Sequence, residues 1–490
     1  MSIEKYLVLN KYMLSLLGVE DFKDIQNVFK NATLGIDLNS GKTHFCELLE
    51  SAFQGIKLSS DDLDRYDGNI QSYLKCINEK RQVKITLKYF QYLSILFTEI
   101  YLDMLKNNKA QFLSDLNEFL ENYKKENSID LINHFTEDDL NKIAFWMATG
   151  SGKTLISHIN YYQFLQYDLF QPDSIIFVTP NEGLSKQHFE EMQKSGIPAK
   201  LYSGSLDAIT PKKGEVLILE ITKLVEEKKG GGKTIPVDAF KGRNLVFVDE
   251  GHKGKKSEEQ KWSKLRDKIS ENGFTFEYSA TFGQVLSEQN ADTLAKYGKS
   301  IIMDYSYKYF YIDQYGKDFE TFNVKNAQKI SENKYKETVF VANLLSYYEQ
   351  LLVYKENKDI VSEYNIEKPL WIFVGSTVTS SKQSREEEKT VSDILDIILF
   401  LKKVLEDKEW LENQIQNILK SKTVFEGKEE ENSDIFSRKF QYLRKRQISI
   451  DDLYEEVFGR KGKLRVYEIV NASGELGLKV GEENYFGVVN

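Results

Sequence analysis

A glycine-rich loop near residue 150 constrains the fold of this chain more than any other feature. The apolar run 143–147 leads into the loop 148–154, with the sequence ATGSGKT, and 155–162 has the pattern of a helix. Backbone N–H groups of such a loop close on phosphate oxygens, and the N-terminus of the following helix adds a favourable dipole. The sequence therefore predicts an α/β domain with a site for nucleotide phosphates.

The side chains of this loop have distinct expected roles. Lys153 reaches the β- and γ-phosphates, and the hydroxyl of Thr154 is placed to bind Mg²⁺. Met147 occupies the first position of the strict Gly-x4-Gly-Lys-Ser/Thr pattern, but the rest of the pattern is intact. The predicted nucleotide-binding residues of the loop are Thr149, Gly150, Ser151, Gly152, Lys153 and Thr154.

Two other Gly-Lys-Thr sequences lack this context. The segment 39–43 follows a stretch that makes a poor buried strand, and its nearest upstream glycine is one residue too far away. The segment 230–234 follows a charged run and is broken by Pro236. Both are interpreted as surface loops.

An acidic pair follows another apolar run, 244–248. A phosphate loop needs an acid that holds the metal and a group that positions the attacking water, both at the end of a neighbouring strand. Asp249 is predicted to hold Mg²⁺, directly or through water, and Glu250 to act as general base toward the attacking water. ATP and Mg²⁺ are therefore the expected cofactors.

The composition excludes several classes of protein. The 490 residues allow two to four domains, and the net charge of −9 argues against a generally basic nucleic-acid coat, although not against a local basic groove. Only two cysteines are present, and the N-terminus lacks the pattern of a signal peptide. With no apolar run of membrane-spanning length, we expect a cytoplasmic protein without a membrane partner.

The pattern of apolar residues divides the chain into four regions. Residues 1–138 are predicted to be mostly helical, and 139–300 alternate short β-branched runs with helical segments, as parallel sheets do. Residues 301–365 form a connecting segment, and 366–490 a second α/β unit with a charged, helix-prone insertion at about 380–460. Strands are predicted at 143–147, 174–178, 216–219, 244–248, 274–278, 369–374, 464–470 and 485–489.

The connecting segment carries a dense group of aromatic residues. These aromatics could stack on nucleic-acid bases, or they could pack a strand into the core, which is the commoner arrangement. The group consists of Tyr305, Tyr307, Tyr309, Phe310, Tyr311 and Tyr315.

These motifs resemble those of superfamily 2 helicases and translocases of the DEAD/DEAH type. The segments 147–154 and 249–252 are similar to motifs I and II, and 279–281 resembles motif III. The segments 179–188, 220–223 and 371–377 fall where motifs Ia, Ib and IV are expected. Within the superfamily, the Asp-Glu-Gly-His sequence of motif II most resembles that of the helicase subunit of type III restriction enzymes and related defence systems.

The resemblance implies a RecA-like first lobe at 139–300, a partial second RecA-like lobe, and an ATP-hydrolysing DNA translocase or helicase. It implies that Ser279 and Thr281 couple ATP to the nucleic acid, and that His252 takes part in the same coupling. Double-stranded DNA and a methyltransferase/recognition subunit are the implied partners. The residues implied to face the nucleic-acid backbone are Thr179, Asn181, Lys186, Thr222 and Lys223.

The sequence departs from the family in two respects. Motifs V and VI are not visible before Asn490, and no nuclease domain is present, so we expect the N-terminal portion of a longer motor or a truncated product. A nucleotide-binding interaction module without motor activity is one alternative, and an RNA helicase is another.

Three further residues carry weaker signals. Gln91 could read adenine from upstream of the loop, although a single glutamine on a predicted helix is weak evidence. His158 and His188 are expected to be structural or surface residues.

Overall fold

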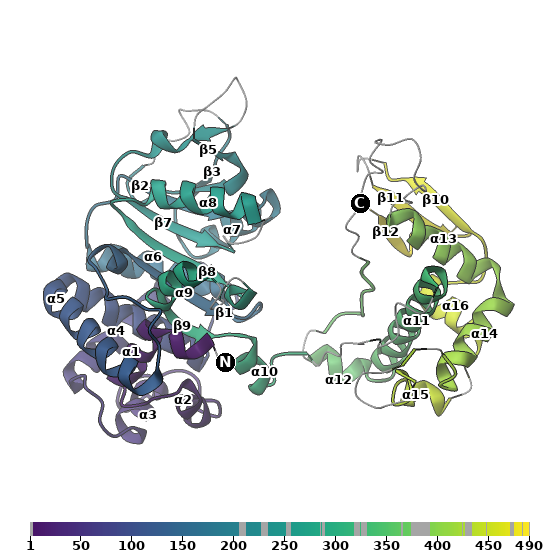
Figure 1. The fold of residues 1–490 in the computed structure, drawn as a ribbon, viewed down its shortest axis with the longest axis horizontal. Helices are drawn as coiled ribbons and strands as arrows, with labels where there is room; N and C mark the ends of the chain where they lie inside the picture. The colour runs from purple at the N-terminus through teal and green to yellow at the C-terminus, as the bar shows by residue number, and fades with distance from the viewer. Residues whose placement is uncertain are drawn as a thin grey trace. The chain divides into compact units, whose positions relative to one another are not determined.

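The computed structural model divides the chain into two compact units, residues 1–318 and 319–490, which are described separately (Figure 1). Its described residues are 3–204, 212–226, 234–250, 256–284, 286, 290–317, 324, 331–363, 366–373, 393–423, 425–426, 434–446, 448–470, 475–482 and 484–489.

The first unit is built on a sheet of seven parallel strands in the order β3-β4-β2-β7-β8-β1-β9. The central strands are buried on both faces, which explains their continuous apolar runs. The RecA-like α/β class is thereby confirmed. The strands are β1 (Lys142–Met147), β2 (Ser174–Thr179), β3 (Ala199–Leu201), β4 (Val216–Glu220), β7 (Asn244–Asp249), β8 (Phe274–Ser279) and β9 (Ile301–Tyr305).

The five strands predicted for this unit are all present, and each is one residue longer than expected. Two strands of the seven-stranded sheet were not predicted: β3 has only three residues, and β9 lies in the segment interpreted as a connection. The flanking helices are α6 (Lys153–Tyr167), α7 (Glu182–Lys194), α8 (Lys256–Ile269), α9 (Ala291–Gly298) and α10 (Tyr307–Ile312), and a short pair, β5 (Leu224–Val225) and β6 (Ile235–Pro236), follows β4.

The predicted helical N-terminal region packs directly on this sheet (Figure 1). Its residues share one core with β1 and β9; for example, Leu93 and Ile100 belong to the same cluster as Phe145. Asn10 donates a hydrogen bond to the carbonyl of Ile302 in β9. The helices are α1 (Val8–Leu16), α2 (Phe22–Phe29), α3 (His44–Ala52), α4 (Ser60–Asn78) and α5 (Tyr89–Asn127).

The aromatic group at 305–315 packs mainly into this core. Tyr305 stacks on Phe90 with ring centroids 3.9 Å apart, and Tyr309 lies edge-on to Phe22. Both tyrosines are buried, which confirms the packing interpretation for them, whereas Tyr307, Tyr311 and Tyr315 remain partly exposed.

The second unit has a helical core of its own and a three-stranded antiparallel sheet. Its helices are α11 (Glu332–Glu356), α12 (Lys358–Glu363), α13 (Asp393–Glu406), α14 (Lys408–Leu419), α15 (Gln441–Arg444) and α16 (Ile450–Phe458), and its strands are β10 (Leu464–Glu468), β11 (Leu476–Val480) and β12 (Gly487–Val489).

Two predictions for this unit were wrong in its described part. Residues 369–373 form no strand, and the strands that do form are antiparallel, whereas a RecA-like lobe needs parallel ones. In β10, Arg465 and Glu468 interrupt the apolar residues, and most of the strand is exposed, unlike the buried strands of the first unit. Exposed strands of this kind are typical of small antiparallel sheets with one face in water, whereas the strands of a parallel sheet are buried on both faces. Among the described residues of the whole chain, every helix is too short or too polar to cross a lipid bilayer.

Candidate nucleotide site

The carboxyl ends of five neighbouring strands bring the predicted motifs to one edge of the sheet. The phosphate loop follows β1, the acidic pair ends β7, and Ser279 ends β8, which lies between those two strands. The predicted nucleic-acid contacts follow β2 and β4, on the other side of β7. Open parallel sheets bind their ligands at this edge.

The phosphate loop adopts a conformation that requires glycine. Gly150 and Gly152 have φ values of 87° and 93°, in the left-handed region, and α6 begins directly after Gly152. A Cβ atom on Gly152 would lie 2.5 Å from Nε2 of Gln91. The backbone N–H and the hydroxyl of Ser151 both donate to the carbonyl of Ala148, which closes the loop into a tight turn.

The ammonium group of Lys153 contacts Glu250, the second residue of the acidic pair, across the sheet edge. Its Nζ lies 3.4 Å from Oε1 of Glu250 and also 3.4 Å from the carbonyl oxygen of Met147. The side chains of Lys153 and Glu250 are both largely buried. Glu250 has a φ of 50°, and its backbone N–H donates to the carbonyl of Tyr278 on β8, which fixes the turn that aims its carboxylate.

Glu250 also contacts the segment after β8. The Ser279 hydroxyl donates to Oε2 of Glu250 at 3.3 Å, and the Ala280 N–H donates to Oε1 at 3.2 Å. The N–H of Thr281 donates to the Ser279 hydroxyl, so the three-residue segment turns around this side chain. One carboxylate thus joins the phosphate loop to the segment predicted to couple ATP to nucleic acid.

Asp249 has a partner that the sequence analysis did not identify. Nε2 of His188, on α7, lies 3.0 Å from Oδ2 of Asp249, and the imidazole is buried. The surface alternative for His188 was therefore wrong, and the buried side chain contacts the predicted metal ligand. His158 is buried as expected; burial lowers its pKa to about 3 and keeps it neutral.

Gln91 belongs to the phosphate loop in space, although it is sixty residues away in sequence. Its Nε2 donates to the carbonyl of Ser151 at 3.0 Å, and its Oε1 accepts from the N–H of Lys88 at 2.9 Å. The ring of Phe310 lies on the other side, 3.6 Å from the position of a Cβ on Gly150. The sequence analysis placed Phe310 only in the aromatic group and not at the phosphate loop, and Gln91 carried only the weak signal of its upstream position.

The predicted nucleic-acid contacts differ in exposure. Thr179 is buried, and its hydroxyl is hydrogen-bonded to that of Ser185 at 2.6 Å, so its side chain does not face a backbone; this expectation is corrected. Asn181 caps α7 by accepting from the Leu184 N–H. Lys186, Thr222 and Lys223 lie toward the surface, with Glu182 or Glu220 as neighbours.

Three further sequence predictions differ in whether the structure describes the residues concerned. Residues 39–41 are an exposed loop, Lys42 pairs with Glu50 and Asp64, and the buried Thr43 caps α3, which confirms the surface-loop interpretation for the loop itself. His252 and residues 230–233 lie outside the described residues.

The donor set at the sheet edge suits a nucleotide with Mg²⁺. Magnesium prefers hard oxygen ligands and usually keeps several waters, needing only one or two from the protein. Thr154, in the first turn of α6, supplies a hydroxyl, and Asp249 supplies a carboxylate. The left-handed glycines leave the space that a Cβ would fill, as a phosphate cradle requires.

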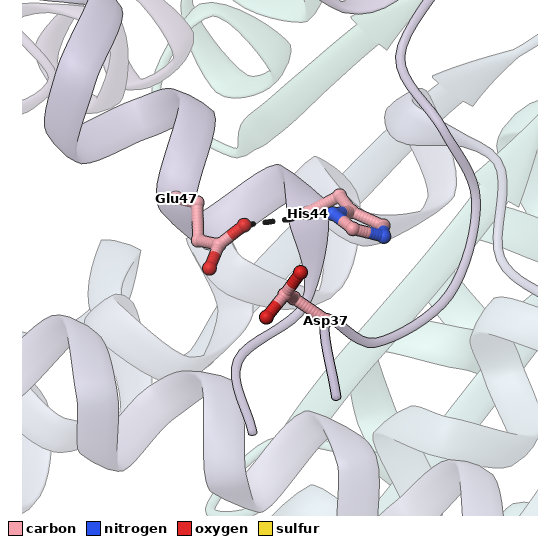
Figure 2. A group of neighbouring side chains, drawn as sticks. All are labelled: Asp37, His44 and Glu47. Carbon is pink, nitrogen blue, oxygen red and sulfur yellow. Dashed lines mark ion pairs between the residues drawn. The ribbon is translucent and has the colours of Figure 1, made fainter. Parts of the chain in front are cut away.

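A second group of ligand-type side chains lies at the surface of the helical region (Figure 2). Nδ1 of His44 lies 3.5 Å from the carboxylate of Glu47, and Asp37 completes the group. The Asp37 carboxylate accepts the N–H groups of Asn39 and Ser40 in its own loop, which lowers its pKa. These contacts account for the group as a loop and helix cap, and we assign it no metal.

The fold and the residues at the sheet edge define a RecA-like α/β lobe of the phosphate-loop class. Residues 116–284 match the family described as type III restriction enzyme, res subunit. The matched region is similar to this family of DEAD/DEAH-type helicases and runs from α5 to the segment after β8. No curated protein sequence matches the chain.

Proposed function

We propose that the chain is the ATP-hydrolysing DNA translocase or helicase subunit of a restriction or related anti-phage defence system. The observation that carries the proposal is the position of Glu250 between Lys153 and the segment 279–281. A general base that contacts both the phosphate loop and the coupling segment can transmit the state of the nucleotide to the rest of the lobe. The family of residues 116–284 supports the same class of activity.

The chain's own residues would divide the chemistry among them. Lys153 and the loop N–H groups would hold the phosphates, and Thr154 with Asp249 would hold Mg²⁺. The metal, when bound, neutralises charge on the phosphate oxygens. Glu250 would orient the attacking water and accept its proton. Because Lys153 contacts Glu250 in this structure, phosphate binding would draw the ammonium away and release the carboxylate for that role.

The exposed side chains beyond β2 and β4 would contact the nucleic-acid backbone. In this proposal Asn181, Lys186, Thr222 and Lys223 supply hydrogen bonds and positive charge to phosphates without reading bases. Such contacts suit a motor that moves over any sequence. Recognition of a specific site would then fall to a methyltransferase/recognition subunit.

The test is ATP hydrolysis by the purified chain with and without double-stranded DNA. Lys153→Ala is the variant, and Lys42→Ala is the matched control, because Lys42 occupies the same Gly-Lys-Thr sequence on a surface loop. We expect DNA-stimulated hydrolysis that is lost in Lys153→Ala and kept in Lys42→Ala.

Three results would replace this proposal. ATP binding without hydrolysis, with or without DNA, would indicate a nucleotide-binding interaction module. Stimulation by RNA but not by DNA would indicate an RNA helicase, since that choice rests on contacts to the 2′-hydroxyl. Undiminished hydrolysis in Lys153→Ala would place the active site elsewhere.

A further inference from the structure

His188 contacts Asp249, the predicted metal ligand, from a helix that follows a neighbouring strand of the sheet. It lies on α7, which follows β2, and β2 pairs directly with β7, the strand that ends in Asp249. An ionised carboxylate can only accept hydrogen bonds, so Nε2 of His188 must carry the proton and donate it to Oδ2 at 3.0 Å. Because a carboxylate has two oxygens, this bond restricts the rotation of Asp249 and leaves an oxygen for a cation.

The imidazole is itself held from several sides. Its ring packs against Phe177 of β2, with ring centroids 4.4 Å apart, and only 3% of the residue is exposed. The C-terminal end of α7 is tied to the helical region, because Arg81 donates to the hydroxyl of Ser195 at 2.8 Å and pairs with Glu191. The donor that meets Asp249 is therefore preorganised by packing and by an ion pair.

The burial of this histidine is not explained by stability alone. Its Nδ1 has no hydrogen-bond partner among the described residues, and neither does Nε2 of His158, which is also buried. A buried polar atom without a partner costs free energy, and an apolar side chain would fill the same space without that cost. The bond to Asp249 is the contact of His188 that an apolar residue could not make.

We propose that His188 is a positioning residue that holds the carboxylate of Asp249 in the orientation that binds Mg²⁺. The proposal rests on the proposed nucleotide function of this site. It corresponds to the general behaviour of metal sites, in which partners hydrogen-bonded to a ligand carboxylate orient it and tune its affinity.

The test measures the Mg²⁺ concentration that gives half-maximal binding of a fluorescent ATP analogue, so it needs no catalytic turnover. His188→Leu removes the donor at similar volume, and His188→Gln restores an N–H near the position of Nε2. Met192→Ala is the control, because Met192 is buried on the same helix and its side chain has no N–H or O–H to donate. Thermal unfolding of each variant without nucleotide shows whether the fold is kept.

We expect His188→Leu to raise the half-maximal Mg²⁺ concentration about tenfold and His188→Gln to recover much of that loss. Met192→Ala should lower the unfolding temperature without changing the Mg²⁺ requirement. An unchanged Mg²⁺ requirement in a folded His188→Leu would overturn the inference, and so would a lower one, which would mean that His188 competes with the metal. A wild-type chain that binds no nucleotide would overturn the proposed function itself.

Discussion

The ammonium of Lys153 lies 3.4 Å from the carboxylate of Glu250, so the phosphate-binding cation and the predicted base neutralise each other in this structure. Both groups are largely buried, where an unpaired charge would be costly. The pairing therefore leaves neither of these two buried charges without a partner in this structure. In the proposed function, nucleotide binding would replace the Glu250 carboxylate by phosphate oxygens as the partner of Lys153.

Glu250→Gln should separate binding from hydrolysis. The amide keeps an oxygen that can accept from Ser279 or Ala280, but it removes the base and the charge that holds Lys153. We expect nucleotide affinity to be unchanged or higher and hydrolysis to fall by about 10²- to 10⁴-fold. Equilibrium binding and steady-state hydrolysis, measured beside Glu220→Gln as a control at the end of β4, check this. Hydrolysis within a few-fold of wild type would exclude Glu250 as the base.

Gly152→Ala should disable the phosphate loop. The φ of 93° strains any residue with a Cβ, at a cost of about 1–2 kcal/mol, and the new atom would also collide with Gln91. We expect nucleotide binding at least about tenfold weaker, since about 1.4 kcal/mol corresponds to tenfold. Adding Gln91→Ala should relieve the collision but not the strain, giving partial recovery. Gly183→Ala is the control, because its Cβ would meet its nearest atom at 3.4 Å; equal losses in both alanine variants would contradict the argument.

Removing Lys186 and Lys223 together should weaken DNA binding equally for all sequences. Each lysine that neutralises a phosphate releases about one counterion, so the slope of log affinity against log salt should become shallower by about 2. Binding of unrelated duplexes over a range of salt concentrations measures both effects. The control is Lys109→Ala with Lys124→Ala, two lysines of α5 that pair with Glu137 and Glu121. A change confined to one DNA sequence would show base readout instead.

Asp304 should make stability depend on pH. Burial raises its pKa to about 6 from 3.8, so the folded state favours the neutral acid. Its stabilising contribution is complete below pH 3.8 and is lost as the pH rises through 6. Asp304→Asn keeps an oxygen that can accept from the N–H of Ser306 and removes the charge. We expect a gain of about 2–3 kcal/mol in the free energy of unfolding near pH 8 that disappears near pH 4.

Chemical denaturation at several pH values, with Asp267→Asn as an exposed control, tests this dependence. The control should show no comparable gain. A gain in Asp304→Asn that is the same at every pH would mean that the charge of Asp304 is not the cause.

The sequence was sufficient for the sheet and the phosphate loop because both depend on local pattern. Strands buried on both faces appear as continuous apolar runs, and the loop is specified by its glycines. The contact between His188 and Asp249 could not be found in this way, since it depends on β2 lying next to β7. Gln91 shows the same limit, because only the packing of α5 on α6 brings it to Ser151.

The errors in the second unit have a different cause. Runs such as 464–468 contain enough apolar residues to predict a strand, but apolar content does not say whether neighbouring strands run in the same direction. The direction of the strands is seen only in their pairing in the folded unit, where β10, β11 and β12 are antiparallel.

The common core of the helical region and the sheet limits how this lobe can be shortened or recombined. A polypeptide that began after α5 would leave the apolar faces of β9 and α6 uncovered, with the carbonyl of Ile302 deprived of Asn10. Large uncovered apolar surfaces lead to aggregation. We therefore expect the first 138 residues to be needed for the solubility of this lobe, and grafting the lobe onto another protein would require carrying them along.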